Sequence, residues 1–245
     1  MQKRIAAILD QADELRRKRQ RAIDRLNQLG QAIFYEMFGD LIKNDRAWPC
    51  SGALGDYAEI ASGITKGRDP KGRLTRRVPY LAVVNVQDKR LQLEAPKEIE
   101  ATENEILRYR LQPGDLLLTE GGDPDKLGRG TLWNGELPEC IHQNHVFRVR
   151  LSSEKYNATF LNWLVGSTYG KRYFLRSAKQ TTGIASINMS QLKAFPMLLP
   201  PIQLQNDFSE RLRKVENVLS SYLSAKNMEN KLFYSVQYRA FQGKL

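Results

Sequence analysis

Three side chains with metal-binding chemistry lie close together in the second half of the sequence. Cys140, His142 and His145 place three potential ligands within six residues. A closed zinc site needs four ligands, and the sequence holds no second Cys or His cluster to supply the fourth. The spacing therefore favours structural roles for these side chains, although Gln143, Asn144 and His145 could equally present amide and imidazole groups to DNA base edges.

The segment 120–130 is the most unusual loop in the sequence because it combines glycines with both signs of charge. It lacks the Gly-Lys-Ser/Thr ending of a phosphate-binding P-loop. Its glycines permit close backbone approach, and its basic side chains suit phosphates or guanine edges. A plain surface turn is the alternative. The predicted DNA contacts in this segment are Gly121, Gly122, Lys126 and Arg129.

Two more segments have the composition of nucleic-acid-binding loops. Residues 67–77 are rich in glycine and basic side chains, and residues 179–188 contain no acidic residue, which suits a loop against phosphate oxygens. A solvated loop is the alternative for residues 179–188. The remaining predicted DNA contacts are Thr65, Lys66, Arg68, Lys71, Arg73, Asn85, Lys179, Thr181, Thr182 and Ser186.

Long helices are predicted at both ends of the sequence, where they would position these loops. Apolar residues recur in steps of three and four from Ile5 to about Phe38, and the pattern returns from residue 201. The first seam runs through Ile5, Ile8, Ala12, Leu15, Arg19, Ala22, Leu26, Leu29 and Ile33. Arg19 would be a costly charge within this seam unless it met Glu229 on an antiparallel partner helix.

The middle of the chain is β-rich, so the predicted fold class is α+β. Strands are expected at 79–86, 115–119 and 146–151, in a compact mixed sheet or small barrel, and a helical stretch at 158–175. The predicted domains are a helix at 1–40, a mixed β-rich domain at 41–200 and a second helix at 201–245. We expect the two helices to form an antiparallel coiled coil.

The composition points to a polyanionic partner, because 38 Lys and Arg face 27 Asp and Glu, a net charge of +11. Nucleic acid is the first candidate and a membrane surface the second. The apolar runs are far shorter than a bilayer span of about 20 residues, and the charged start does not resemble a secretory signal. A cytoplasmic protein with two reduced cysteines is therefore expected.

With these elements in order, the sequence resembles the specificity subunits of type I restriction-modification systems. The resemblance rests on the sequences at 32–40, 114–123, 186–192, 200–205 and 239–245. It implies a target-recognition domain at 41–200 and helices that dock methyltransferase subunits, with a restriction subunit as a further partner. S-adenosylmethionine would belong to the methyltransferase, and this chain would hold no cofactor, metal or catalytic residue.

The chain departs from the family pattern, because it has one recognition domain where the family normally has two. It therefore resembles a half-size subunit or a fragment, and we predict that two copies associate through the helices to read a bipartite site in double-stranded DNA. Two other classes remain open. One is a small metal-dependent nuclease with carboxylates at Asp115, Glu120 and Asp123, and the other is a coiled-coil adaptor that binds only protein.

Overall fold

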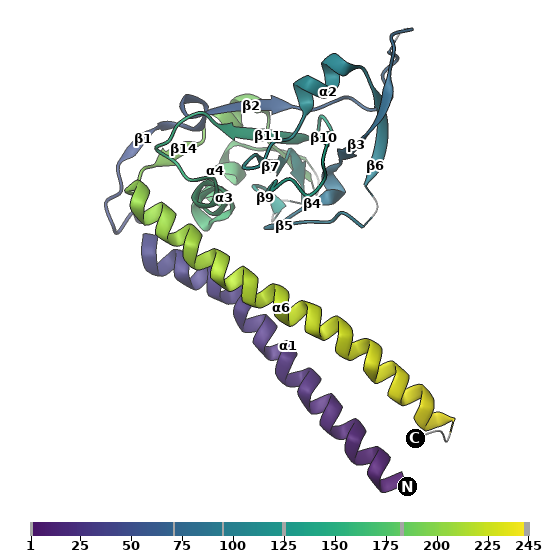
Figure 1. Ribbon diagram of the computed structural model, residues 1–245. Coiled ribbons are helices and arrows are strands. Elements are labelled where there is room, and N and C mark those ends of the chain that lie inside the picture. The colour runs from purple at the N-terminus through teal and green to yellow at the C-terminus, as the bar shows by residue number, and fades with distance from the viewer. Residues whose placement is uncertain (1, 71, 95, 124–125, 182–183, 243–245) are drawn as a thin grey trace. The chain divides into compact units, whose positions relative to one another are not determined.

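The computed structural model describes residues 2–70, 72–94, 96–123, 126–181 and 184–242 (Figure 1). Its contacts divide the chain into two compact units. The helical unit joins the chain up to Gly39 with the chain from Asp207 onward, and the central unit comprises residues 40–206. Among the described residues, none of the helices combines the length and the apolar composition that a membrane span requires.

Two long helices, α1 (Gln2–Phe38) and α6 (Ile202–Phe241), form the helical unit. They run antiparallel, since the ring of Phe34 lies 5.4 Å from that of Phe208, and the guanidinium of Arg16 lies 4.6 Å from the ring of Phe233 (Figure 1). The prediction of paired antiparallel helices is thus confirmed. Their apolar spacing explains the pairing, because each helix would otherwise expose an apolar stripe to water.

The end of α1 follows from Gly39, as the sequence predicts. Gly39 has φ of 75°, which favours glycine, and its backbone N–H donates to the carbonyl of Tyr35 at 2.8 Å. Next to this end, Phe34, Phe38 and Phe208 form an aromatic cluster with ring centroids 5.0 to 5.5 Å apart. The cluster anchors one end of the helix pair.

The predicted seam of α1 is only partly right. Leu15 and Leu29 belong to it but are 56% and 40% exposed. The buried residues Ile23 and Phe34 each lie one position after a predicted seam residue, Ala22 and Ile33. A helix with about 3.6 residues per turn drifts by about 20° per heptad, so the buried line moves from one register to the next. The predicted pairing of Arg19 with Glu229 lies outside the described residues, because the Glu229 side chain is not described.

The central unit contains all the strands described. They are β1 (Cys50–Ala53), β2 (Ala58–Ser62), β3 (Arg76–Leu81), β4 (Val86–Gln87), β5 (Arg90–Leu91), β6 (Lys97–Ala101), β7 (Leu116–Thr119), β8 (Gly121–Gly122), β9 (Gly130–Leu132), β10 (Ile141–His142), β11 (Val146–Leu151), β12 (Lys179–Thr181), β13 (Ile184–Ser186) and β14 (Pro196–Leu198). The helices are α2 (Glu103–Tyr109), α3 (Ala158–Gly166), α4 (Thr168–Ser177) and α5 (Met189–Lys193), with 3-10 turns η1 (Leu54–Asp56) and η2 (Val83–Asn85).

These strands form several small sheets. The largest has the order β2-β11-β7-β9 and is antiparallel throughout. Strand β10 pairs in parallel with β3, which also pairs with β6, and β8 pairs with the β12–β13 hairpin. The two inner strands of the largest sheet are buried on both faces, since Leu116, Leu117, Val146 and Val149 are all inaccessible to water. The core of the central unit therefore surrounds this sheet.

Two predicted elements differ in the structure. The strand expected at 79–86 ends at Leu81 and continues as η2. The helical stretch expected at 158–175 is broken at Ser167, whose ψ of 170° is extended. The Ser167 hydroxyl donates to the carbonyl of Leu164 and accepts from the N–H of Gly170, so one side chain ends α3 and begins α4.

Candidate nucleic-acid interface

The structure brings the loops after β2 and β10 together. The backbone N–H of Ile64 donates to the carbonyl of His142 at 2.8 Å, and the N–H of Asn144 donates to the carbonyl of Ile64 at 3.0 Å. The Ser62 hydroxyl adds a bond of 2.6 Å to the carbonyl of Asn144. Thr65 and Lys66, both exposed, are therefore held beside Asn144.

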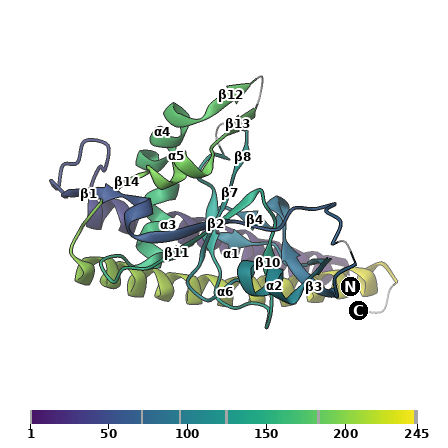
Figure 2. The same cartoon turned by 90° about the horizontal axis from the view of Figure 1, so that it is seen from above.

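The glycine-rich segment after β7 joins the same group of loops. The N–H of Glu120 donates to the carbonyl of His145, and the carbonyl of Glu120 accepts from the N–H of Ile187. Strand β8 pairs with β13, which places Gly121 opposite Ser186 (Figure 2). We call residues 64–66, 120–122, 143–145 and 185–187 the loop cluster. It gathers predicted contacts from four separate stretches of the sequence.

A chain of polar side chains lies within the loop cluster. The Nδ1 atom of His145 lies 2.6 Å from Oε2 of Glu120, and Nδ2 of Asn144 lies 3.5 Å from Nε2 of His145. The His145 side chain is 56% exposed and that of Glu120 34% exposed. These groups are therefore ordered by one another and still accessible to a ligand.

The basic part of the glycine-rich loop is anchored next to the loop cluster. The N–H of Thr119 donates to the carbonyl of Arg129 at 3.2 Å, and the Arg129 guanidinium donates to Oε1 of Gln87 at 3.2 Å. Lys126 is exposed and forms an ion pair with Asp123. Arg129 is thus held beside Thr119, which precedes the loop cluster in the sequence, and Lys126 lies in the same loop, paired with Asp123.

Two of the predicted DNA contacts, Arg68 and Asn85, have hydrogen-bond partners within the central unit. Arg68 donates twice to the Glu105 carboxylate, at 2.6 and 2.8 Å, and this guanidinium lowers the pKa of Glu105 to about 2. Asn85 is 8% exposed, and its carboxamide bonds to the backbone of Ala82 and Gln92. Each of these side chains therefore has part of its hydrogen-bonding capacity engaged within the protein, which sequence patterns could not reveal.

The other predicted contacts are exposed or are not described. Arg73 and Lys179 are exposed, on the loop before β3 and at the start of β12. Lys71 and Thr182 lie outside the described residues, and the side chain of Thr181 is likewise not described.

The potential metal ligands of the sequence have structural surroundings. Burial raises the pKa of the Cys140 thiol to about 12. His142 is fully buried, and its Nδ1 atom lies 2.7 Å from the carbonyl oxygen of Val146, so Nδ1 carries the proton and donates. Within the described part of the chain, no three His, Cys, Asp or Glu side chains are grouped as a metal site would need.

The three carboxylates of the nuclease alternative each have a hydrogen-bond partner of their own within the protein. Asp115 is buried and accepts from the Arg150 guanidinium at 2.7 and 2.8 Å. Glu120 pairs with His145, and Asp123 with Lys126. A metal-dependent nuclease needs carboxylates that converge on a cation, and these side chains are instead paired one by one.

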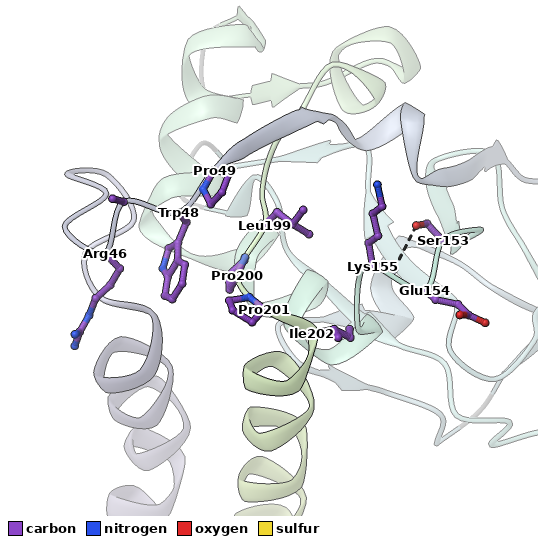
Figure 3. Close-up of a pocket in the computed structure, with 11 residues that line it drawn as sticks. Arg46, Trp48, Pro49, Ser153, Glu154, Lys155, Leu199, Pro200, Pro201 and Ile202 are labelled. Atoms are coloured by element: carbon purple, nitrogen blue, oxygen red, sulfur yellow. Dashed lines mark hydrogen bonds between the residues drawn. The ribbon is translucent and has the colours of Figure 1, made fainter.

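A separate apolar cleft of about 860 Å³ opens elsewhere on the central unit. Figure 3 shows Trp48 and Pro49 on one side of it, the stretch from Leu199 to Ile202 next to them, and Ser153 to Lys155 opposite. None of the predicted DNA contacts lines this cleft. Its mostly apolar lining suits packing rather than phosphate binding, so we place the candidate site at the loop cluster.

The fold defines a class of protein in which a β-rich domain lies in the sequence between two long antiparallel helices. No model of a protein family matches the chain. It is 24% identical over 201 residues to the type I restriction enzyme StySPI specificity subunit of Salmonella potsdam, covering 79% of this chain and 42% of the relative.

Solved structures show the same fold. The HsdS subunit from Thermoanaerobacter tengcongensis matches with a TM-score of 0.58 at 18% identity, over 99% of this chain and 57% of that one. A chain from a study of complex assembly and conformational transition in the type I R-M system matches with a TM-score of 0.56 at 16% identity, over 99% of this chain and 58% of that one. The chain is thus similar in sequence to the specificity subunit of a type I restriction enzyme and similar in fold to solved structures from type I restriction-modification systems. It spans about two fifths of the length of the curated relative.

Proposed function

We propose that the chain is a DNA-recognition subunit that directs partner enzymes to a specific site and is itself not catalytic. The central unit would be its target-recognition domain. The observation that carries this proposal is the loop cluster, in which backbone bonds join four predicted contact segments. A net charge of +11 adds the long-range attraction to phosphates that DNA binding requires.

The proposed contacts are those predicted residues that are at least partly exposed or that belong to the loop cluster. They are Thr65, Lys66, Arg73, Gly121, Gly122, Lys126, Arg129, Asn144, His145, Lys179 and Ser186. Lysines and arginines would bind phosphates and set the register, and the amide and imidazole groups would contact base edges.

The partners we propose are methyltransferase subunits, which would carry S-adenosylmethionine, and a restriction subunit. Among the described residues of the central unit, no three His, Cys, Asp or Glu side chains are grouped as a metal site would need, and the Asp115 carboxylate accepts hydrogen bonds from Arg150. The chemistry would therefore lie in the partners. Incubation of the purified chain with DNA and Mg²⁺ tests the nuclease alternative directly, because cleavage by the chain alone would contradict a non-catalytic role.

Two copies of the chain are proposed to associate through the helical unit and to read a two-part site. The helical unit leaves Leu15, Leu29, Tyr222 and Leu223 between 39% and 56% exposed, and apolar side chains repeated along a helix pair suit a further helical partner. Light scattering measures the mass of the purified chain. A monomer both alone and with co-purified methyltransferase would refute the dimer.

DNA affinity as a function of salt tests the proposed interface. The Lys126→Ala variant should bind duplex DNA more weakly, and the slope of log affinity against log salt should fall by about 1 if the lysine binds a phosphate. Lys43→Ala is the matched control, because Lys43 is 79% exposed and lies outside the loop cluster. Equal affinities for wild type and Lys126→Ala would place DNA on another face. Absence of DNA binding with methyltransferase present would favour the adaptor alternative.

A further inference from the structure

Glu120 is the acidic member of the loop cluster, and a carboxylate is unexpected on a surface that binds phosphates. Repulsion between Glu120 and the DNA backbone would weaken binding to every sequence. A carboxylate can only accept hydrogen bonds, and phosphate oxygens also only accept. On duplex DNA, the donors that such a group can reach are the amino groups of the bases.

The structure holds this carboxylate in place while leaving it able to accept more bonds. His145 donates from Nδ1 to Oε2 of Glu120 at 2.6 Å, and the Glu120 backbone is fixed at both its N–H and its carbonyl. A carboxylate offers about four acceptor positions, so one bond from a histidine does not use its capacity. The side chain is 34% exposed.

Of the two glycines that follow Glu120, Gly122 is the one with open space beside it, because a Cβ there would meet only the Lys126 side chain, at 3.9 Å. Gly121 and Gly122 have no side chains, and a Cβ on Gly121 would lie 2.8 Å from the carbonyl oxygen of Ala185, so the paired strand enforces glycine there. Asn144, on the other side of His145, carries an amide that can both donate and accept. The group therefore combines a fixed acceptor with an adaptable amide.

From this geometry we infer that Glu120 is a specificity-determining residue, which accepts a hydrogen bond from a base amino group in the major groove. Cytosine N4 is the usual partner of a carboxylate there. His145 is a positioning residue, because it holds the carboxylate through Nδ1. This inference rests on the proposed DNA-recognition function and names the base chemistry that one side chain reads.

The test selects bound sequences from a random duplex library with the full chain, alone and with co-expressed methyltransferase. The wild type should select a motif with cytosine at one position. Glu120→Gln keeps an oxygen that can accept from His145 but loses the charge. It should reduce the preference for cytosine at that position on the order of ten- to a hundredfold and favour adenine, which pairs with glutamine.

Two further variants make the result specific. Asp123→Asn removes a charge three residues along the same loop, where the side chain is 58% exposed, and should leave the selected motif unchanged. His145→Leu removes the donor to Glu120 and should weaken discrimination at the position that Glu120 reads. Thermal unfolding midpoints equal to that of the wild type confirm that each variant is folded.

The outcomes separate this inference from the proposed function. A wild-type chain that selects no motif in either setting would overturn both. A wild-type motif that Glu120→Gln selects unchanged would overturn the role of Glu120 and leave the DNA-recognition function standing. A Glu120→Gln variant that binds all duplexes more tightly with the same motif would show that the carboxylate only repels phosphates, which also overturns the inference.

Discussion

Acid should destabilise this protein through His142, whose imidazole is fully buried in the central unit. Burial lowers the pKa of His142 to about 4, from an ordinary value of 6.5, although the hydrogen bond with the Val146 carbonyl opposes the shift. Its Nε2 atom has no hydrogen-bond partner among the described residues. A proton added to Nε2 in the folded protein would therefore have no hydrogen-bond acceptor among the described residues.

The sign of the effect follows from which state binds protons first. As pH falls below 6.5, the unfolded chain protonates this histidine and the folded chain does not, so the free energy of unfolding decreases until pH reaches about 4. Between about pH 7.5 and pH 4.5 the loss is about 2.5 kcal/mol, from 1.36 kcal/mol per pKa unit. The carboxylates of Glu105 and Glu139, with a pKa of about 2 each, lose stabilising interactions mainly below this range.

Urea unfolding followed by circular dichroism at about pH 7.5 and pH 4.5 measures this loss. His142→Asn is the variant of choice, because an asparagine amide can replace the Nδ1 donor to the Val146 carbonyl and does not titrate. The variant should be less stable than the wild type at the higher pH but should lose about 2.5 kcal/mol less on acidification. An equal loss in both proteins would refute the buried, neutral state of His142.

Three other predictions follow from individual side chains. Cys50 is exposed and should react with a thiol reagent in the native protein. Cys140 should react only on unfolding, because burial raises the pKa of its thiol to about 12. Equal reaction rates of the two cysteines in the native protein would contradict this. Gly63→Ala would place a Cβ 1.9 Å from the backbone carbonyl oxygen of His142 in β10. A lower melting temperature and weaker DNA binding are therefore expected. Unchanged values of both would show that β10 can shift. Phe208→Ala should lower the free energy of unfolding by about 3 to 5 kcal/mol, measured by urea unfolding against Tyr234→Ala, a 64% exposed control on the same helix that should be near neutral.

The helices were largely predictable because their signals are local. Apolar spacing and Gly39 define α1 and its end, and the alternation at 146–151 marks β11. The burial of Arg148 within this strand, where the residue is 3% exposed, has no such local signal. Its guanidinium donates to the carbonyl of Arg108 and pairs with Glu59, and burial lowers its pKa. Partners that distant in the sequence leave no periodic signal.

The loops of the candidate site were predicted one by one, but their assembly was not. Glycine content and charge identify the segment after β7, yet nothing in the sequence indicates that Glu120 bonds to the backbone of His145 and Ile187. Arg68 lies in a basic, glycine-rich loop of the kind that contacts DNA, and only the fold shows that its guanidinium binds Glu105. Pairing between β-strands depends on long-range contacts, which composition does not encode.

The hydrogen bonds of the Gln205 side chain have a consequence for experiments that exchange the central unit between such chains. Gln205 is fully buried, donates to the carbonyls of Lys155 and Pro200, and accepts from the N–H of Asn157. The first turn of α6 thus supplies a buried side chain that holds the backbone of the central unit. If a transplanted central unit ended before Gln205, the carbonyls of Lys155 and Pro200 and the N–H of Asn157 would lose their native partner. A transplanted unit that ended after Asn206 would include Gln205 and keep all three hydrogen bonds.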